Sequence, residues 1–460
     1  MSVSVSQKNT DQKLFFYSHS HLLGVKMEET FDVAIVGAGP AGISAACLLA
    51  DQGVKTIVVE RGEYPGSKNI SGGVLYGHDL YQILPDFPAQ NCPIERNIVE
   101  SRLWYLSKDG GYSLSYRNQI FAQERKQNVF TVGRAKFDRW FAEQAKKKGA
   151  LMACGTVVTD LLRDDQNRIV GVQTDRADGD LRAKLVLLAD GVNSPLAAKT
   201  GFRPEPKPHQ VALAVKEVIE LSEEQIQERF NVEPNNGVTI EILGVVTKGM
   251  NGIAVIYTNR KSLSLCIGAN LSDLAQHKVK PYEMMEDFKE HPMVAPLIRG
   301  GKSTEYMAHW IAEGGYDSIP QLCGDGFLIG GDSAMLFNTL HREGSNLAMT
   351  SGRFAAEAML EALEKGDFSR HGLQGYISRL QNSYIFKDLK KYKRFGQFLE
   401  THPELFTSLP EWASQAAREI LTVNGVPKKE KQKVLWNQLR AKISPMRLLR
   451  IFWDGWRSVK

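Results

Sequence analysis

The sequence predicts an α/β fold in which a dinucleotide-binding unit is interrupted by a second β-sheet and followed by a helical, basic C-terminal region. A glycine-rich turn joins an apolar strand to a helix near the N-terminus, which is typical of a nucleotide-binding sheet. The segment from Val211 to Gly268 alternates and is rich in Val, Ile and Thr, which favours an antiparallel sheet. At 460 residues the chain is too long for one core, so we expect two closely joined lobes.

The first folded element is predicted over Phe31–Val36, where a short, β-branched apolar run indicates a buried parallel strand. The sequence GAGPAG follows at 37–42, and an Ala- and Leu-rich helix then extends to Asp51. A second apolar run, Thr56–Val59, closes at Glu60. Strand, tight turn, helix and strand together make a βαβ unit.

The glycines of GAGPAG suit a dinucleotide because each meets a separate steric demand. Gly37 permits the tight turn, Gly39 lets the backbone approach a pyrophosphate, and Gly42 allows the helix to pack closely on the strand. The positive end of the helix then favours the phosphates. Glu60 follows 18 residues after Gly42, where its carboxylate can accept hydrogen bonds from both ribose hydroxyls. A plain structural turn is the alternative interpretation of the glycines.

Beyond this unit the chain leaves the nucleotide-binding sheet and then returns to it. Residues 64–132 lose regular periodicity, which indicates an insertion, and an amphipathic helix follows over 134–148. Apolar runs at 157–158, 169–172 and 185–189 predict strands of the first domain. After the alternating segment we expect an apolar strand at 326–330 and a glycine-led helix from about residue 345 to 364.

These elements divide the chain into a polar, Ser-rich extension that we expect to be disordered, two interleaved domains and a C-terminal region. The expected boundaries are 1–27 for the extension; 28–75, 130–205 and 305–365 for the discontinuous nucleotide-binding domain; 76–129 and 206–304 for the β-sheet domain on the substrate side; and 366–460 for the helical, basic region.

Two later segments distinguish FAD from NAD, because each places an aspartate beside glycines after an apolar strand. They are 189–194, which contains Asp190, and 330–334, which contains Asp332. The pair resembles the two signatures of glutathione-reductase-like flavoproteins of the p-hydroxybenzoate-hydroxylase and geranylgeranyl-reductase type. The resemblance implies a non-covalent FAD with a ribityl hydroxyl bound by Asp332. It also implies that the helix beginning near Gly344 points its amide end at the flavin pyrimidine.

The same resemblance implies roles for Arg134, which opens its helix with Arg-x-x-Phe-Asp spacing, and for the backbone of Val158 beside adenine. A surface arginine at a helix start is the alternative for Arg134. The expected cofactor-binding residues are Gly37, Gly39, Pro40, Ala41, Gly42, Glu60, Arg61, Lys68, Gly72, Gly73, Arg134, Val158, Asp190, Gly191, Ser194, Gly331, Asp332, Gly344, Ser345, Asn346 and Leu347.

Two further segments indicate a narrower branch of these flavoproteins. Residues 64–77 read YPGSKNISGGVLYG, with paired glycines that would let the backbone lie against an isoalloxazine ring, and residues 341–349 read HREGSNLAM. Together they resemble FixC-type electron-transfer-flavoprotein:quinone oxidoreductases over about residues 28–393. The resemblance implies FAD-dependent electron transfer from an electron-transferring flavoprotein heterodimer (alpha and beta subunits) to quinone. It also implies a FixABCX-type complex with a ferredoxin-like FixX-type iron–sulfur subunit, in which any electron bifurcation would lie on the partner.

An iron–sulfur cluster is not expected in this chain, and no metal site is predicted. The five cysteines are scattered singly without a CxxC pair, and none follows Cys323. Mitochondrial relatives carry a cysteine-rich cluster domain at the C-terminus, whereas this C-terminus is cysteine-free and basic. The cluster would therefore lie on the separate ferredoxin-like subunit.

His341 is the one catalytic residue that the sequence suggests. Electron transfer through a flavin needs proximity and a tuned potential rather than a nucleophile, so no catalytic triad is expected. His341 lies beside the helix expected to face the flavin, where an imidazole can supply a proton to the reduced flavin or to the quinone. A structural hydrogen bond is the alternative role.

Positive charge is concentrated at the C-terminal end. The chain has a net charge of +5, yet residues 428–460 alone carry +8, from ten Lys or Arg and two acids. Ser444 and Pro445 suit a helix start, and large apolar residues recur at helical spacing over 444–460. This helix can contact an anionic membrane surface, dock on an acidic partner or pack on the protein's own core. No nucleic-acid partner is expected.

The hydropathy of the sequence bears on where the protein works. No stretch approaches the ~20 apolar residues of a membrane-spanning helix, so we expect a cytoplasmic protein, with peripheral contact at the inner face of the cytoplasmic membrane as an option.

One rival function is geranylgeranyl-reductase-type reduction of isoprenoid double bonds. A second is an FAD-dependent aromatic hydroxylase that uses NADPH and oxygen, and a third is a flavin-bearing sensor without turnover.

Overall fold

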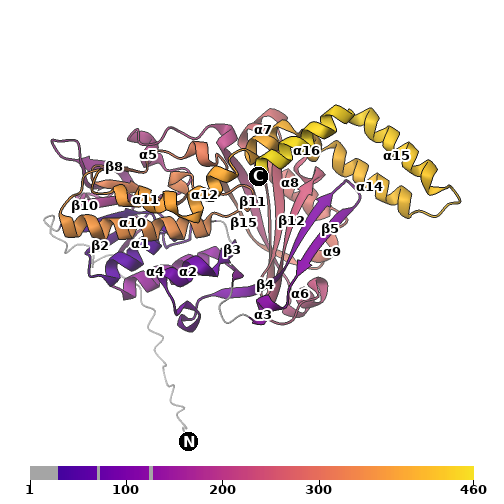
Figure 1. Cartoon of the computed structure of the whole chain (residues 1–460). Coiled ribbons are helices and arrows are strands. Elements are labelled where there is room, and N and C mark those ends of the chain that lie inside the picture. The colour runs from indigo at the N-terminus through magenta and orange to yellow at the C-terminus, as the bar shows by residue number, and fades with distance from the viewer. Residues whose placement is uncertain (1–29, 70–72, 124–127) are drawn as a thin grey trace, which may run out of the picture.

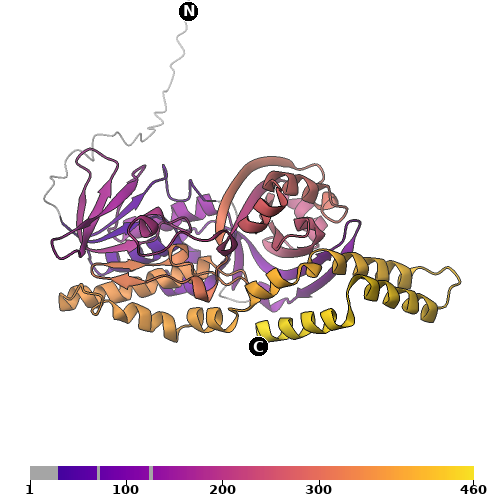
Figure 2. The ribbon, with the colours of Figure 1, turned by 90° about the horizontal axis from the view of Figure 1, so that it is seen from above.

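The computed structural model describes residues 30–69, 73–123 and 128–460, which form two sheet-based lobes with C-terminal helices along one side (Figures 1 and 2). The α/β fold predicted from the sequence is confirmed, with two sheets and a helical C-terminal region. The extension expected over residues 1–27 lies outside the described residues.

The first lobe contains a sheet of eight strands within the described part of the chain. Its centre is β1 (Phe31–Val36), which pairs in parallel with β2 (Thr56–Glu60) and with β10 (Leu181–Leu188). Strands that are buried on both faces have continuous apolar sequences, and these apolar runs are what predicted β1, β2 and β10. The other strands are β7 (Leu151–Cys154), β17 (Phe327–Ile329), the edge strand β16 (Cys323–Gly324), and the ribbon of β8 (Val158–Arg163) and β9 (Ile169–Thr174).

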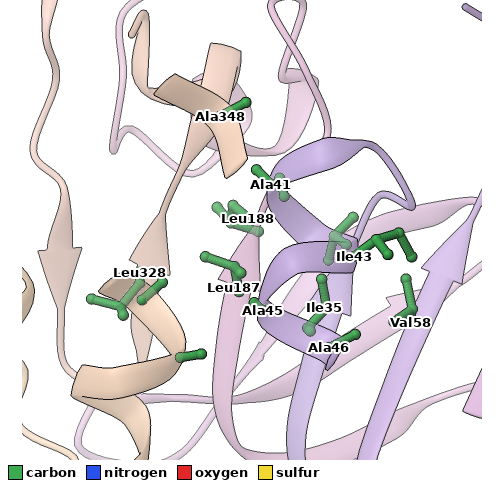
Figure 3. Packing of buried hydrophobic residues seen from close by; sticks show 14 of the residues in the cluster. Ile35, Ala41, Ile43, Ala45, Ala46, Val58, Leu187, Leu188, Leu328 and Ala348 are labelled. Atoms are coloured by element: carbon green, nitrogen blue, oxygen red, sulfur yellow. The ribbon is translucent and has the colours of Figure 1, made fainter. Parts of the chain in front are cut away.

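Three helices pack together beside this sheet: α1 (Pro40–Asp51), α4 (Arg134–Lys147) and α10 (Ser345–Lys365). Figure 3 shows the small residues of α1 lying between the strands and the start of α10, with Ala41 directed toward Ala348. The crossing of α1 and α10 is so close that a Cβ on Gly352 would lie 2.0 Å from the carbonyl oxygen of Ala41. The core therefore fixes where both helix N-termini lie.

The second lobe is a nine-stranded sheet within the described residues, and one of its pairings differs from the antiparallel expectation. Strands β12 (Asn236–Gly244) and β4 (Ile94–Leu106) run parallel, whereas the other pairs are antiparallel. Alternating apolar residues report that one face is buried, but they do not report strand direction. The remaining strands are β3 (Gly73–Tyr76), β5 (Gly111–Arg117), β6 (Val129–Val132), β11 (Val211–Glu220), β13 (Gly252–Thr258), β14 (Ser262–Asn270) and β15 (Lys302–Ala312).

Three boundary strands belong to a different sheet from the one that the sequence indicated. Strands β3, β6 and β15 fall wholly or mainly in segments expected to form the nucleotide-binding domain, yet all three pair within the second sheet. The chain crosses between lobes at these strands, and only their hydrogen-bond partners reveal which sheet they join. The boundaries expected near residues 75, 130 and 305 therefore shift by several residues.

The two faces of the second sheet differ in chemistry. One face packs its apolar side chains under α6 (Glu223–Phe230) and α8 (Pro281–Glu290), with Ile256 and Phe288 among the buried residues. The opposite face, toward the first lobe, carries polar groups such as Lys216 and Cys266, which are register partners on β11 and β14. Burial lowers the pKa of the Lys216 amine to about 8, with Arg134 of the first lobe acting in the same direction. A polar interior thus lies between the lobes.

The C-terminal region is helical, as expected. Helices α11 (Gln374–Asn382) and α12 (Tyr384–Lys391) follow α10, and α13 (Phe395–Thr401) leads to the hairpin of α14 (Ser408–Leu421) and α15 (Lys428–Lys442). The helical hairpin packs against the second sheet. There the hydroxyl of Tyr112, on β5, donates to the carbonyl oxygen of Ala413 at 2.9 Å. No described helix is long and apolar enough to cross a membrane. The other helices are α2 (Gly77–Ile83), α3 (Ile120–Gln123), α5 (Pro195–Lys199), α7 (Leu271–His277), α9 (Ala295–Ile298) and α16 (Pro445–Val459).

Arg96 joins three segments of the second sheet from inside the protein. Its side chain on β4 is fully buried. The guanidinium donates to the carbonyl oxygens of Asn259 at 2.6 Å, Asn236 at 2.9 Å and Arg260 at 3.1 Å. These carbonyls lie at the start of β12 and in the β13–β14 turn. One guanidinium therefore satisfies three backbone acceptors from two separate parts of the sheet.

We predict that Arg96→Met lowers the free energy of unfolding by about 3 kcal/mol, because three backbone carbonyl oxygens lose the fully buried guanidinium that donates to them. Urea denaturation followed by circular dichroism measures the change. The matched control is Arg182→Met, at an exposed position on β10, which should change the free energy by less than about 0.5 kcal/mol. Equal losses in the two variants would contradict the assigned role.

Candidate cofactor site

The glycine-rich turn between β1 and α1 is shaped by steric contacts at two of its glycines and is open at the third. A Cβ on Gly37, whose φ is +102°, would lie 2.3 Å from the carbonyl oxygen of Ala189. A Cβ on Gly42 would lie 2.0 Å from the carbonyl oxygen of Gly37. A Cβ on Gly39 would meet nothing within 4 Å, so the backbone at the start of α1 borders open space. That space is where a pyrophosphate can approach the helix N-terminus.

Glu60 lies at the end of β2 and is held by the same turn. One carboxylate oxygen accepts from the backbone N–H of Ala38 at 2.9 Å, and the other accepts from the N–H of Gly62 at 2.6 Å. Thr156 donates its backbone N–H to the Glu60 carbonyl at 3.0 Å, which brings the segment before Val158 beside the carboxylate. The structure thus places the segment that leads into Val158 next to the end of β2.

Asp190 is half-buried after β10 and links the two later signature segments. Its Oδ1 accepts from the hydroxyls of Ser194 at 2.8 Å and Ser333 at 3.0 Å. The Ser333 hydroxyl also accepts from the Gly191 N–H at 2.8 Å. Burial raises the pKa of Asp190, against the hydrogen bonds from the two serines. Its Oδ2 is buried without a hydrogen-bond partner among the described residues, so an acceptor remains available there.

Arg203 is a positioning residue that the sequence analysis did not identify. Its fully buried guanidinium donates to the carbonyl oxygens of Ser333 at 3.1 Å, Val192 at 2.7 Å and Asn193 at 2.9 Å. These carbonyls belong to both signature loops, so one side chain fixes the distance between them. No local motif surrounds Arg203, so no sequence pattern indicated its role.

Arg134 opens α4 and forms a bidentate ion pair with Asp138. Its Nε lies 2.9 Å from Oδ1 and its Nη2 lies 3.0 Å from Oδ2 of that carboxylate. Burial alone would lower the pKa of the guanidinium, but the charge of Asp138 raises it. Burial also raises the pKa of Asp332, while the charge of Arg134 opposes that shift. Gly73 lies alongside, since a Cβ there would be 3.7 Å from Cγ of Arg134.

The N-terminus of α10 meets the signature loops and β3. Gly344 is the N-cap residue, and no side chain of the described residues caps the 21-residue helix. A Cβ on Gly331 would lie 2.9 Å from Cβ of Ala41, so η5 (Gly331–Ala334) is in contact with the start of α1. The Ser345 hydroxyl is 3.4 Å from the carbonyl oxygen of Val74, and Asn346 Oδ1 is buried without a partner among the described residues. Uncapped amides and positive helix potential favour an anionic ring system here.

A pocket of about 210 Å³ opens between β3, β12 and the loop before α10. Tyr76, Tyr257 and Glu241 contribute polar groups to its wall, and so do His341 and Arg342. Arg342 has a φ of +54° and forms an ion pair with Glu241, which links the loop to the second sheet. The pocket is therefore formed jointly by both lobes.

Two polar side chains lie near the loop before α10. His341 is exposed and its ring stands edge-on to Tyr392, with ring centroids 5.0 Å apart. Glu313, just after β15, is a group that the sequence analysis did not consider. Burial raises its pKa to about 7, against a hydrogen bond with Thr339 and the charge of Arg342.

Most of the expected cofactor residues thus lie along one continuous surface. It runs from Glu60 and the glycine turn, past Asp190 and η5, to Arg134, Gly73 and the start of α10. Arg61 and Lys68 are exposed side chains, and their cofactor contacts stay predictions. Gly72 lies outside the described residues. The open backbone at Gly39, the unpaired Oδ2 of Asp190 and the uncapped start of α10 together fit an extended dinucleotide.

Solved structures with the same fold include a reductase-like protein and a flavin-dependent halogenase. A geranylgeranyl bacteriochlorophyll reductase-like protein from Thermoplasma acidophilum superimposes with a TM-score of 0.68 at 19% identity, covering 90% of this chain and all of that one. CmlS, a flavin-dependent halogenase, gives a TM-score of 0.62 at 18% identity, covering 89% of this chain and 70% of that one. Identities this low show the shared fold alone.

Sequence comparisons identify the family. Residues 32–192 match the family described as FAD dependent oxidoreductase, and residues 395–460 match the ETF-QO/FixC family C-terminal domain. Protein FixC of Bradyrhizobium diazoefficiens is 46% identical over 409 residues, or 88% of this chain and 94% of that protein. FixC of Azotobacter vinelandii is 43% identical over 436 residues, covering 94% and 100%, and FixC of Escherichia coli K12 is 40% identical over 412 residues, covering 89% and 94%. The chain therefore belongs to the FixC family of FAD-dependent oxidoreductases.

Proposed function

We propose that this chain takes electrons from an electron-transferring flavoprotein heterodimer onto its FAD and passes them toward a quinone, as the FixC subunit of a FixABCX-type complex. The observation that carries the proposal is the 40–46% identity to FixC proteins over most of both chains. The match of residues 395–460 to the domain shared with the ETF-QO family gives independent support.

In this proposal each group along the cofactor surface would have a separate task. The amides at Gly39 and the start of α1 would hold the pyrophosphate, and Glu60 would accept from the adenosine ribose. Asp332 would accept from a ribityl hydroxyl, and the start of α10 would face the pyrimidine edge of the ring. When bound, the flavin accepts and releases electrons, so the chain's own residues only orient it and stabilise its charge.

The pocket of about 210 Å³ is the proposed place for the quinone head group. It is smaller than a typical drug-sized site of ~300–1,000 Å³, which suits one ring better than a long isoprenoid chain. Burial raises the pKa of Tyr76 to about 12 and also raises that of Tyr257. Both phenols therefore keep their protons at neutral pH and can donate to quinone oxygens.

Partners and placement follow from the same proposal. A ferredoxin-like FixX-type subunit would carry the iron–sulfur cluster, since the five cysteines of this chain come from separate segments and each stands as a free thiol. The protein would work in the cytoplasm, with α16 in the segment 444–460 as its peripheral contact at the membrane or with a partner. The structural likeness to a reductase-like protein and to a probable FAD-dependent monooxygenase is at 19% identity or less, so it shows the fold and does not favour either alternative.

Glu60→Ala should weaken FAD binding at least about tenfold, because a charged acceptor for the ribose is lost. The dissociation constant is measured by titrating the apoprotein with FAD and following flavin fluorescence. Glu63→Ala, at an exposed acid three residues away, should leave the constant within twofold of the parent. If both variants bind FAD equally well, Glu60 is not the ribose ligand.

Anaerobically reduced protein should be reoxidised rapidly by a soluble ubiquinone or menaquinone analogue, and slowly without it. Stopped-flow absorbance of the flavin gives both rates. Tyr257→Phe should slow the quinone-dependent rate by about tenfold through loss of one hydrogen-bond donor, with FAD content unchanged. Tyr282→Phe, at an exposed tyrosine on α8, is the control. Reoxidation driven by a prenyl substrate, or by oxygen with an aromatic acid, in place of quinone would overturn the proposal.

If Glu313 supplies the proton that accompanies electron transfer to quinone, the rate should fall as pH rises through about 7. A carboxyl group donates only while protonated, which is the state below its pKa. Glu313→Gln should be slower at pH 6 and lose the inflection, whereas His341→Asn should keep it. An inflection that persists in Glu313→Gln and vanishes in His341→Asn would assign the proton to the histidine.

A further inference from the structure

A second pocket, of about 540 Å³, lies between the end of α12 and the C-terminal helix α16. Six of its eight lining residues are Lys or Arg, and the other two are Trp453 and Trp456. No acid lines it. The cations come from segments about 60 residues apart. Lys390, Lys391, Lys393 and Arg394 belong to α12 and the turn after it, whereas Arg457 belongs to α16 and Lys460 directly follows it.

The positive charge of this pocket is scarcely neutralised by the described part of the protein. Of the six cations, only Lys393 has a carboxylate within 4.0 Å among the described residues, and Asp317 lies at the limit, 3.9 Å away between two exposed side chains. An ion pair of that length between exposed side chains contributes little to stability and neutralises little of the charge. Like charges held this close repel one another, and an anion would relieve that repulsion. An anion with several oxygens can accept hydrogen bonds from more than one of the cations.

The helix that forms one wall presents an apolar face beside the pocket. Met446, Leu449 and Phe452 are exposed, as are Trp453 and Trp456, with 54–80% of each side chain accessible. These positions fall on one side of α16 by helical spacing. The sequence left open whether this face packs on the protein's own core. The exposure of these five side chains shows that it does not.

The opposite side of α16 is fixed to the protein, so the exposed face has a defined direction. Arg447 pairs with Glu404 at 2.5 Å, and Asp454 lies 3.2 Å from the His402 ring. Gly455 lies against a phenyl ring of α13, where a Cβ would be 3.2 Å from Phe398 Cζ. Seen from above, α16 (yellow) lies on the same side of the molecule as helices α10–α12 (orange) (Figure 2).

We propose that this pocket binds the phosphate head group of an anionic phospholipid while Leu449 and Phe452 enter the acyl boundary beside it. The charge complements phosphate, and the two tryptophans stand between the cations and the apolar face, which is the level they prefer at a membrane interface. The site deepens the peripheral contact in the proposed function and rests on it for its biological setting. The physical binding does not require electron transfer.

The test is co-sedimentation of the FAD-loaded full chain with phosphatidylcholine vesicles, with and without phosphatidylglycerol. Binding should need phosphatidylglycerol and weaken with salt. The variant Lys390→Gln/Lys391→Gln/Arg394→Gln should bind about a hundredfold less tightly, at about fivefold per charge near an anionic surface. The charge-matched control Lys147→Gln/Lys261→Gln/Lys302→Gln changes exposed lysines outside the pocket, and it should bind within threefold of the parent.

Three outcomes would overturn the assignment: no vesicle binding by the parent, equal binding by the pocket variant and the parent, or equal losses in both triple variants. A parallel calorimetric titration with inorganic phosphate separates the sources of the anion. Phosphate binding that the pocket variant loses, without any vesicle binding, would indicate a soluble ligand instead of a lipid. Flavin reoxidation by a soluble quinone analogue should be unchanged in the pocket variant, so failure of the lipid site is distinguishable from failure of the proposed redox function.

Discussion

The close contact between backbone segments at the start of α1 is the constraint on which the cofactor lobe depends. Gly37 abuts the carbonyl of Ala189, Gly42 abuts Gly37, and Gly352 of α10 abuts the carbonyl of Ala41. No side chain fits at these three points, so β1, β10 and two helices are held at one spacing. Because Ala189 directly precedes Asp190, the glycine turn also sets where the second signature segment lies.

Buried polar contacts then hold the loops that this packing brings together. Asp190, Ser333 and Arg203 form a connected network across both signature loops, and Arg134 is oriented by Asp138. In a low-dielectric interior each of these groups needs its partner, so the loops have little freedom to separate. The acceptor left over, Oδ2 of Asp190, is buried without a hydrogen-bond partner among the described residues. Rigid loops with open acceptors suit a cofactor that must keep one geometry while electrons pass.

The second lobe contributes one wall of the pocket beside the loop before α10. Its sheet turns an apolar face to its helices and a polar face to the cofactor lobe, and the Arg342–Glu241 ion pair connects the loop before α10 to that polar face. The pocket beside it is small and contains hydrogen-bond donors that stay protonated. Electron transfer requires that a partner ring come near the flavin, and no nucleophile is needed.

The sequence by itself determined the features that depend on local pattern. Apolar runs located β1, β2 and β10, and the GAGPAG turn with Glu60 located the dinucleotide surface, because strand burial and glycine sterics act over a few neighbouring residues. The FixC family was also predicted from short segments, and the comparisons confirmed it. Strand direction was not predictable, so the parallel pairing of β12 with β4 and the placement of β3, β6 and β15 in the second sheet came only from the structure. The roles of Arg203, Glu313 and the basic pocket also came from the structure, because each depends on residues far apart in sequence that only tertiary packing brings together.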